Sequence, residues 1–343
     1  MAPLTGKRCP IASKVRISYN YRIMGQPPLF GFLAIDKPPR KTSRDVVNVV
    51  QRMVRPAKAG HAGTLDPLAT GVLVVCVGPA TRLVSLVQES RKQYRATFRF
   101  GVTSETDDLE GDVVLVSDAP RLTQENIAAV LPEFVGIIDQ IPPRHSAVHV
   151  NGRRAYQLAR QGQNPELSPR KVSVQRIEIE NFNETAQILT CEIECGSGTY
   201  IRSLGRDIAA RLGTGCVMTD LRRLAVGEFS ISSAIPLHEL TAETLVSALQ
   251  PARLAFDHDA EWIELTIAEW EEIRHGRFIS RGKLISDTSQ RRLPLMYQNK
   301  LAALGRYDPD RQAIRPEMVF PLAPAESMHD LQRRDNEPSP AGN

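Results

Sequence analysis

The feature that most constrains this chain is a glycine-punctuated loop that runs directly into a long apolar strand. Residues 60–71 read GHAGTLDPLATG and hold one carboxylate, Asp66, followed by Pro67. A residue before proline is pushed toward extended or turn geometry, and the glycines allow tight turns and close backbone approach. The unbroken apolar run Val72–Val77 is typical of a buried strand. Asp-Pro is also ordinary turn chemistry, but a lone acid on a loop at the mouth of a rigid sheet occupies a frequent position for a catalytic group.

Strands and helices are predicted to follow one another along the rest of the chain. Tyr94–Phe100 alternates apolar and polar side chains, which is typical of a half-buried strand. Thr42 or Ser43 can cap a helix that carries valines on one face. Periodicity, caps and turn residues predict further strands at 30–38, 172–179, 188–195, 225–231, 301–306 and 318–320, and further helices at 81–89, 123–134, 153–160, 200–212 and 266–275.

No metal site is predicted. The acidic stretch Glu105–Asp112 lacks the ligand spacing of a calcium loop, so we expect a solvated turn there. Cys191 and Cys195 are not followed by a second pair, and neither His145 nor His149 has an obvious partner. The cysteines in strand-like runs are expected to be small buried side chains in a reducing compartment.

The two ends of the chain differ in composition from the body. Residues 1–29 carry five basic and no acidic side chains, and we expect a disordered basic arm. A targeting peptide, or an upstream start codon with Met24 as the true start, are the alternatives. Residues 323–343 are polar and proline-bearing, and are expected to be disordered. A separate small unit is predicted from about Trp262.

Net charge alone does not indicate nucleic-acid binding. The whole chain carries +4, but the basic arm accounts for that excess and leaves the body nearly neutral. RNA binding would therefore require basic side chains gathered on one face. The candidates are Arg40/Lys41/Arg44, Arg55/Lys58, Arg91/Lys92/Arg95, Arg153/Arg154 and Arg222/Arg223. The longest apolar run is far below the ~20 residues of a membrane-spanning helix, so we expect a cytoplasmic protein without a membrane segment.

Five separate segments resemble one family. Besides the loop around Asp66, these are KQYR at 92–95, IPP at 141–143 with Ser146-Ala147, GTYIRSL at 198–204 and LRRLAVG at 221–227. Together they resemble the TruB family of pseudouridine synthases, which isomerise uridine 55 of tRNA. The resemblance is strong from Phe32 to Phe229 and weaker from Trp262 to Phe320.

The resemblance implies a mixed α/β (α+β) fold. Its catalytic domain, expected at 30–258, has a long, mostly antiparallel sheet flanked by helices. A small β-rich RNA-binding domain of the PUA type is expected at 261–322.

The resemblance also implies four catalytic residues. Asp66 would be the nucleophile, paired with Arg202; Tyr94 would stack on the target base and can accept a proton; Tyr200 would orient the base or the Asp66 carboxylate. Local sequence also allows non-catalytic alternatives, in which both tyrosines are core aromatic residues and the Arg202 side chain extends into solvent. Arg202 falls in the first turn of a predicted helix, where a cation opposes the helix dipole by roughly 0.3–1 kcal/mol. A carboxylate such as Asp66 would offset that cost.

Two further residues are implied to contact the substrate. His61 would fill the gap left when the base leaves the RNA stack, although a histidine in a glycine-rich loop can also be a turn residue. Leu221 would wall the pocket. His145 stands where family members often have tyrosine.

The implied reaction needs no cofactor and no metal, because it breaks an N–C glycosidic bond and forms a C–C bond without redox change or phosphoryl transfer. A two-acid glycosidase fits less well, because no second acid has a comparable setting. We expect the T-stem-loop of tRNA as substrate, with no obligatory protein partner and a monomeric enzyme. A guide-RNA-dependent synthase and a non-catalytic RNA-binding module are the alternatives.

Overall fold

The computed structural model describes residues 29–146, 148–150, 152–159, 161–163, 167–256, 260–281 and 292–322. The tail predicted at 323–343 lies outside these residues, as does the arm predicted at 1–29 except for its last residue. The domain boundary predicted between 258 and 261 falls next to the undescribed residues 257–259 and stays a prediction.

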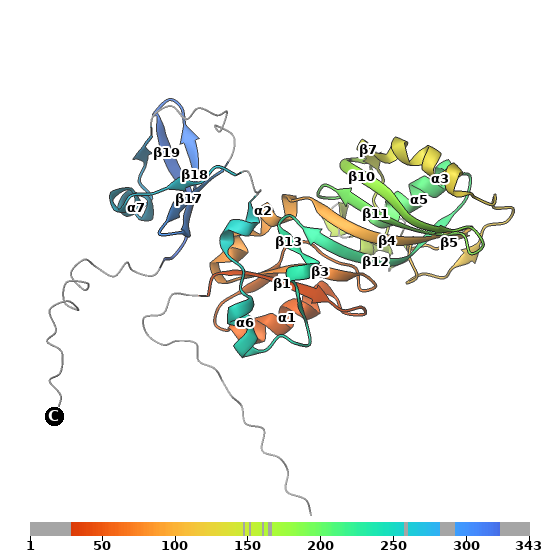
Figure 1. The fold of residues 1–343 in the computed structure, drawn as a ribbon, viewed down its shortest axis with the longest axis horizontal. Coiled ribbons are helices and arrows are strands. Elements are labelled where there is room, and N and C mark those ends of the chain that lie inside the picture. Colours follow the sequence, from red (N-terminus) through yellow and green to blue (C-terminus); the bar gives the residue numbers. More distant parts are fainter. Residues whose placement is uncertain are drawn as a thin grey trace, which may run out of the picture.

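A ten-stranded mixed sheet forms the main body (Figure 1). Its strands follow the order β14-β1-β3-β12-β4-β11-β10-β7, with β2 on β3 and β13 on β12. The pairs β1–β14 and β3–β12 are parallel, and the other pairs are antiparallel. The strands are β1 Gly31–Lys37, β2 Ala59–His61, β3 Thr70–Val77, β4 Lys92–Phe100, β7 Gly136–Gln140, β10 Arg170–Asn183, β11 Ile188–Cys195, β12 Cys216–Val226, β13 Phe229–Ser230 and β14 Ile235–Pro236. The expected mixed, mostly antiparallel sheet is thus confirmed.

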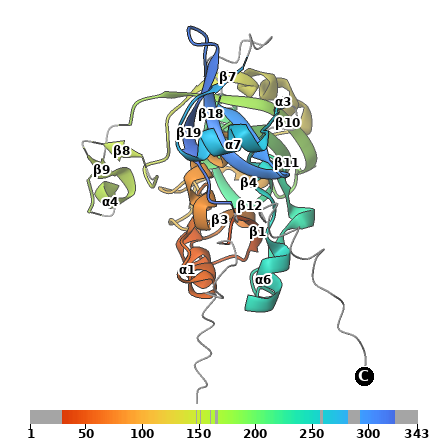
Figure 2. The same ribbon diagram turned by 90° about the vertical axis from the view of Figure 1, so that its left-hand side faces the viewer.

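Helices flank this sheet, and two hairpins extend from it. The helices are α1 Ser43–Val54, α2 Val84–Glu89, α3 Gln124–Val130, α4 Ala155–Ala159, α5 Ile201–Arg211 and α6 Ala242–Ala248, with 3-10 turns η1 Gly78–Leu83, η2 Leu131–Phe134, η3 Ile231–Ser233 and η4 Ala252–Ala255. The hairpins are β5 Val102–Thr103 with β6 Val114–Leu115, and β8 His149–Val150 with β9 Arg153–Arg154. Figure 2 shows β8, β9 and α4 standing out to one side of the body.

A second, five-stranded sheet follows in the chain. Its order is β15-β17-β18-β19-β16, and Figure 1 shows it at one end of the long body. Its elements are β15 Ile263–Glu264, α7 Ile267–Arg274, β16 Ile279–Ser280, β17 Leu293–Tyr297, β18 Lys300–Asp308 and β19 Ala313–Val319. The β-rich C-terminal region is confirmed; its assignment to the PUA type stays a prediction.

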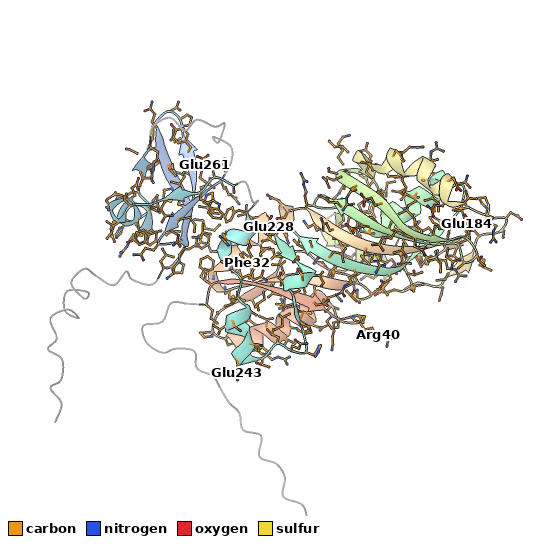
Figure 3. All side chains as sticks on the ribbon, in the orientation of Figure 1. Phe32, Arg40, Glu184, Glu228, Glu243 and Glu261 are labelled. Atoms are coloured by element: carbon orange, nitrogen blue, oxygen red, sulfur yellow. The ribbon has the colours of Figure 1, made fainter. Side chains whose placement is uncertain are left out.

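Strand β3 is buried on both faces, as its unbroken apolar sequence predicts. Leu73, Val75 and Val77 pack into one core cluster, and Val72 and Val74 pack into the other. The second cluster also takes in Phe32 and residues of the C-terminal sheet; Figure 3 shows Phe32 in the part of the body nearest that sheet.

The C-terminal sheet is fastened to the body by aromatic packing and a hydrogen bond. The rings of Phe30 and Phe320 stack with centroids 5.2 Å apart. The guanidinium of Arg82 lies over the Phe320 ring and donates a hydrogen bond of 2.7 Å to the carbonyl of Val319. Burial of this kind is the main favourable term in holding two units together.

Several predicted boundaries differ from the structure. The strand expected at 225–231 is instead the end of the long β12, which begins at Cys216, followed by a turn and the short strand β13. Register shifts between Met218 and Asp220 and between Arg223 and Ala225 break the alternation of β12, so the sequence pattern hides it. The helix expected at 153–160 begins with two strand residues of β9 and is helical only over Ala155–Ala159. No helix of the described residues is long and apolar enough to cross a membrane.

Replacing Gly205 by alanine tests the packing of α5 on the sheet. An added Cβ would lie 2.4 Å from Cε1 of Phe98. We expect a net destabilisation of about 1–3 kcal/mol from overpacking, although alanine is the better helix former. The exposed Ala210→Gly on the same helix should cost about 1 kcal/mol through propensity alone. Denaturant unfolding of both variants measures this, and a more stable Gly205→Ala protein would contradict the packing.

Candidate active site

The loop that carries Asp66 joins β2 to β3, and its backbone is held by two buried cations. The Nζ of Lys37, at the end of β1, donates to the carbonyls of Pro38, Lys41 and Pro67 at 3.0, 2.7 and 3.3 Å. The guanidinium of Arg223 donates to carbonyls of Gly63, Thr64 and Val72, the shortest bond being 2.7 Å to Val72. These contacts go to backbone oxygens, so they fix the loop and leave the Asp66 carboxylate free.

Helix α1 holds the same loop from another side. Ser43 accepts a hydrogen bond from the backbone of Leu65 at 2.8 Å and donates to its carbonyl at 3.2 Å. Thr42 caps this helix in a capping box with Asp45, as its sequence suggests. The position of Asp66 is therefore set by β1, α1, β3 and β12 together.

Arg202 pairs with the Asp66 carboxylate from the start of α5. Its Nε lies 3.0 Å from Oδ2 of Asp66, and its side chain is only 6% exposed. The Asp66 side chain remains 34% exposed. One side of the carboxylate is thus bound to a cation and the other is open, which is an arrangement suited to attack on a bound molecule.

A second carboxylate, Asp108, shares the same guanidinium. Its Oδ2 lies 3.3 Å from Nη1 of Arg202, and its side chain is 2% exposed. Oδ1 of Asp108 accepts hydrogen bonds from Thr106 Oγ1 at 2.6 Å and from the backbone of Glu110 at 2.9 Å. Glu105, Leu109, Glu110 and Asp112 are exposed as expected, but the expectation of a solvated turn is wrong at Asp108. Spacing within the loop gives no sign of this burial, because it comes from the distant Arg202.

Electrostatics around Asp66 are set by burial and by three charged neighbours. Burial raises the pKa of the Asp66 carboxyl above its ordinary value, and the nearby Asp108 adds to this. Arg202 and Lys37 oppose the rise. Burial also lowers the pKa of Lys37 to about 8. Burial and Asp108 therefore disfavour the charged form of Asp66, and the two cations favour it.

Both predicted tyrosines lie within electrostatic range of Asp66. Tyr94, on β4, is buried and sits opposite Arg223 in the register of β4 and β12. Tyr200 is the N-cap residue of α5, and its backbone exchanges two hydrogen bonds with the side chain of Gln140. Burial raises the pKa of both phenols, and the negative charge of Asp66 contributes to each rise.

The two predicted substrate-contact residues border the same region. His61 ends β2, five residues before Asp66; burial lowers the pKa of its imidazole, and Nδ1 is buried without a hydrogen-bond partner among the described residues. Leu221, on β12, belongs to the same buried cluster as Tyr94 and Leu65. The sequence interpretation missed Asp108, Lys37 and Arg223. Of these, only Lys37 carries a sequence signal, a lysine at the end of a largely apolar strand and directly before a proline.

Some predicted basic clusters are not available for RNA. Arg223 is only 1% exposed, so the Arg222/Arg223 pair is not a surface cluster. Arg222 pairs with Asp36 at 2.8 Å, and Arg95 pairs with Glu180. By contrast, Arg40, Lys41 and Arg44 at the start of α1 are exposed.

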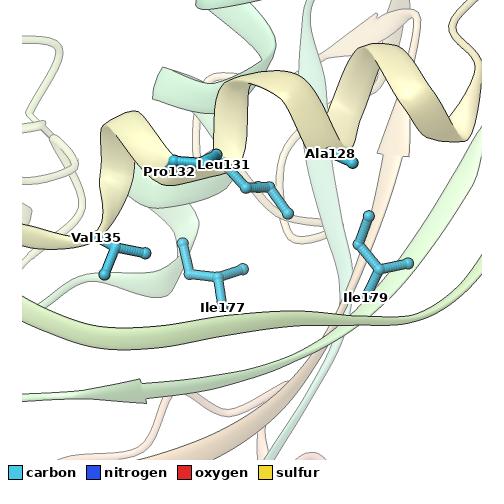
Figure 4. Close-up of a pocket in the computed structure, with 6 residues that line it drawn as sticks. All are labelled: Ala128, Leu131, Pro132, Val135, Ile177 and Ile179. Carbon is cyan, nitrogen blue, oxygen red and sulfur yellow. The ribbon is translucent and has the colours of Figure 1, made fainter.

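Other parts of the described chain offer no comparable chemistry. Among the described residues, no group of three His, Cys, Asp or Glu side chains could hold a metal ion. Figure 4 shows a hollow between the α3–η2 segment and β10, with apolar side chains as its lining, namely Ala128, Leu131, Pro132, Val135, Ile177 and Ile179. Such a lining can pack against apolar groups but provides no acid, base or nucleophile.

Comparison with known proteins places the chain among RNA-modifying enzymes. Residues 51–201 match the family model described as TruB family pseudouridylate synthase (N terminal domain), and residues 202–255 match the tRNA pseudouridylate synthase B C-terminal domain. The tRNA pseudouridine synthase B of Mycobacterium sp. (strain KMS) is 43% identical over 254 residues, covering 73% of this chain and 84% of that protein. The same-named protein of Synechococcus elongatus (strain ATCC 33912 / PCC 7942 / FACHB-805) is 48% identical over 212 residues, covering 61% and 72%.

Solved structures give the same picture. A chain of a Cbf5-Nop10-Gar1 complex aligns with a TM-score of 0.64 and 28% identity, covering 87% of this chain and 89% of that one. A chain of an H/ACA RNP bound to a substrate RNA containing 2'-deoxyuridine aligns with a TM-score of 0.64 and 25% identity, covering 86% of each chain.

Replacing Arg202 by glutamine should destabilise the protein by about 3 kcal/mol near pH 7.5, because two carboxylates lose their shared partner. The pKa of Asp66, already raised by burial, rises further without the guanidinium. An acid with a raised folded-state pKa favours the protonated native state, so the loss is full above that pKa and shrinks as pH falls through it. Urea unfolding near pH 7.5 and pH 5 measures both effects.

The matched control is Arg211→Gln, which removes an exposed pair with Glu133 from the same helix. Exposed pairs contribute about 0–1 kcal/mol, so this variant should stay close to the parent at both pH values. Equal losses of unfolding free energy for Arg202→Gln and Arg211→Gln would show that Arg202 stabilises the protein no more than an exposed ion pair does.

Proposed function

The chain belongs to the TruB family of pseudouridylate synthases, which makes it an isomerase, and from this premise we propose that it converts uridine 55 in the T-loop of tRNA to pseudouridine. The observation that carries the proposal is the Asp66–Arg202 contact of 3.0 Å, in which a half-open carboxylate is held at the mouth of the sheet.

The proposed reaction moves the uracil from an N-glycoside to a C-glycoside with no net gain or loss of atoms. The bond between N1 and C1′ breaks, the base rotates within the site, C5 bonds to C1′, the proton on C5 leaves, and N1 takes up a proton. Asp66 starts this sequence, either by attacking carbon or by removing a sugar proton. A closed site suits such a reaction because water would intercept a reactive sugar intermediate.

The neighbouring side chains fit supporting roles. Arg202 holds the Asp66 carboxylate in place and balances its charge. Tyr94 stacks on the uracil and relays a proton, because its neutral phenol gives up its own proton as it accepts another. Tyr200 orients the base from the N-terminus of α5. Each good base–aromatic stack contributes about 1–3 kcal/mol, which offsets part of the cost of flipping the base out of the RNA.

Two residues accommodate the flipped nucleotide. We assign to His61 the filling of the space that the base vacates, because it lies on the loop of Asp66 yet outside the catalytic pair. Leu221 walls the pocket on the side of β12. The exposed basic side chains of Arg40, Lys41 and Arg44 are candidates for contacts to RNA phosphates. Such contacts would add salt-dependent affinity that does not depend on the RNA sequence.

A tRNA substrate is supported by the names of the bacterial relatives, which are called tRNA pseudouridine synthase B. The structural neighbours include a Cbf5 chain in a complex with Nop10 and Gar1. Identity is higher to the Mycobacterium protein, at 43%, than to that chain, at 28%. We therefore propose an enzyme of the bacterial type, which needs neither guide RNA nor protein partner. We also propose that it is monomeric and cytoplasmic. The unit at 261–322 is proposed to grip RNA as a PUA-type domain.

The change Asp66→Asn should abolish release of tritium from C5-labelled uridine in tRNA, by at least about 10⁴-fold, because the amide cannot act as nucleophile or base. Binding of tRNA, measured by filter retention at a stated salt concentration, should change little because the amide keeps the size of the side chain. Turnover at the parental rate by this variant would exclude the mechanism. A non-catalytic binding module would instead bind tRNA but release no tritium even as the parent protein.

Activity on a bare T-stem-loop separates the proposed enzyme from a guide-dependent one. The purified chain should release tritium from an isolated T-stem-loop without any added protein or RNA. Release should stop when cytidine replaces uridine 55 alone while the other uridines stay labelled. Activity that appears only with a guide RNA and partner proteins would contradict the proposed independence of the enzyme from them. Release of tritium from another uridine would contradict the assignment of uridine 55 as the target.

A further inference from the structure

A second arginine, Arg206, lies one helical turn after Arg202 on α5. We propose that it is a positioning residue for the reaction. By pairing with Asp107 it keeps this carboxylate from competing for Arg202, so that the Arg202 guanidinium continues to bind Asp66 and Asp108. This inference rests on the proposed function, because it concerns how the catalytic pair is kept in register.

The two arginines bind the same two segments of the chain. Arg202 contacts the acidic loop through Asp108, and its Nη2 donates to the carbonyl of His145 at 3.2 Å. Arg206 contacts the acidic loop through Asp107, with 3.1 Å between Nη1 and Oδ2, and its Nη2 donates to the carbonyl of Ile141 at 2.8 Å. Residues four apart on a helix lie side by side, so the two guanidinium groups form neighbouring links from α5 to the same two segments.

The acidic loop presents two adjacent carboxylates: Asp108 pairs with Arg202, and Asp107 pairs with Arg206, which also pairs with Asp207 at 3.0 Å. Asp107 is only 15% exposed, so it needs a cation. Burial raises the pKa of Asp107, and Arg206 opposes this rise more than Arg202 does. Arg202 contacts the next residue, Asp108, so it is the cation that still acts on Asp107 when Arg206 is removed.

A shift of Arg202 toward Asp107 would act directly on Asp66. The guanidinium already divides its hydrogen bonds between two carboxylates and two carbonyls. A third carboxylate in its range weakens its hold on Asp66, and misplacement of a reacting group by about 1 Å can cost on the order of 100-fold in rate.

The contact with Ile141 adds a mechanical constraint. The carbonyl of Ile141 accepts hydrogen bonds from both Ser203 and Arg206, at 2.9 and 2.8 Å. This residue directly follows β7, on the way to the projecting hairpin β8–β9 seen in Figure 2. Arg206 therefore fixes the start of the segment whose His145 carbonyl touches Arg202.

The charged and titratable groups near the pair are few enough for a pH test. Around Asp66 they are Arg202, Asp108, Lys37, Tyr94 and Tyr200. Around Asp107 they are Arg206, Arg202, Asp207 and, on β12, the thiol of Cys216. Reaction requires ionised Asp66, so a weaker hold by Arg202 raises its pKa and moves the acid limb of the rate profile to higher pH.

The test compares Arg206→Gln, Asp107→Asn and the double variant in full-length protein. We expect Arg206→Gln to slow single-turnover tritium release by about 10- to 100-fold, with the affinity for tRNA unchanged and the acid limb moved upward. Adding Asp107→Asn removes the competing carboxylate, so the double variant should recover most of the rate and the parental acid limb. Arg206→Lys should be intermediate, because an ammonium keeps the charge but cannot bridge as a planar fork does.

Arg211→Gln is the matched control on the same helix, and it should leave rate, affinity and pH profile unchanged. If the double variant is as slow as Arg206→Gln, or if the acid limb of Arg206→Gln does not move, Arg206 is only a structural residue and the inference is overturned. A parent protein that makes no pseudouridine would instead refute the proposed function, so the two failures are distinguishable.

Discussion

The ion pair between Arg202 and Asp66 is the contact on which the rest of the site depends. A guanidinium with 6% of its side chain exposed has lost nearly all contact with water, and in the first turn of α5 it also faces the positive end of the helix dipole. Both costs require carboxylates nearby, and Asp66 and Asp108 provide them from two loops that are distant in sequence. Neither acid alone accounts for all the hydrogen bonds that Arg202 makes, so the arrangement assembles as a whole.

The sheet brings these loops together. Strands β3 and β12 run parallel, with Arg222 beside Thr70 and Arg223 beside Gly71, so the loop before β3 lies against β12. A Cβ at Gly71 would come within 2.2 Å of the Arg223 carbonyl, which explains why glycine occupies this position at a positive φ of 95°. Lys37 and Arg223 then hold the loop through its carbonyl oxygens. Positive charge beneath the loop thus fixes its backbone, while Asp66 remains available for substrate.

Local sequence predicts those parts of the structure whose signal is local. Three such features could be predicted from the sequence, because each depends on neighbours a few residues apart. They are the Thr42 cap, the alternation of Tyr94–Phe100 and the buried run Val72–Val77. Burial of Asp108 and Arg223 was not readable, because both are charged side chains whose partners lie far along the chain. The bulges of β12 likewise hid a central strand behind an irregular pattern. The boundaries of the two domains and the roles of the site residues stay predictions.

Sharing Arg202 between two carboxylates also explains how a buried acid can remain reactive. A bidentate pair with a single arginine would hold Asp66 as a strongly stabilised anion and occupy both of its oxygens. Here Nε of Arg202 lies 3.0 Å from Oδ2 of Asp66, while Nη1 lies 3.3 Å from Asp108 and donates to the carbonyl of Thr106. Burial pushes the pKa of Asp66 up, and the two cations push it down. The Asp66 carboxylate is therefore held by an arginine that it shares with Asp108, and its side chain remains 34% exposed on the side where the proposed substrate would approach.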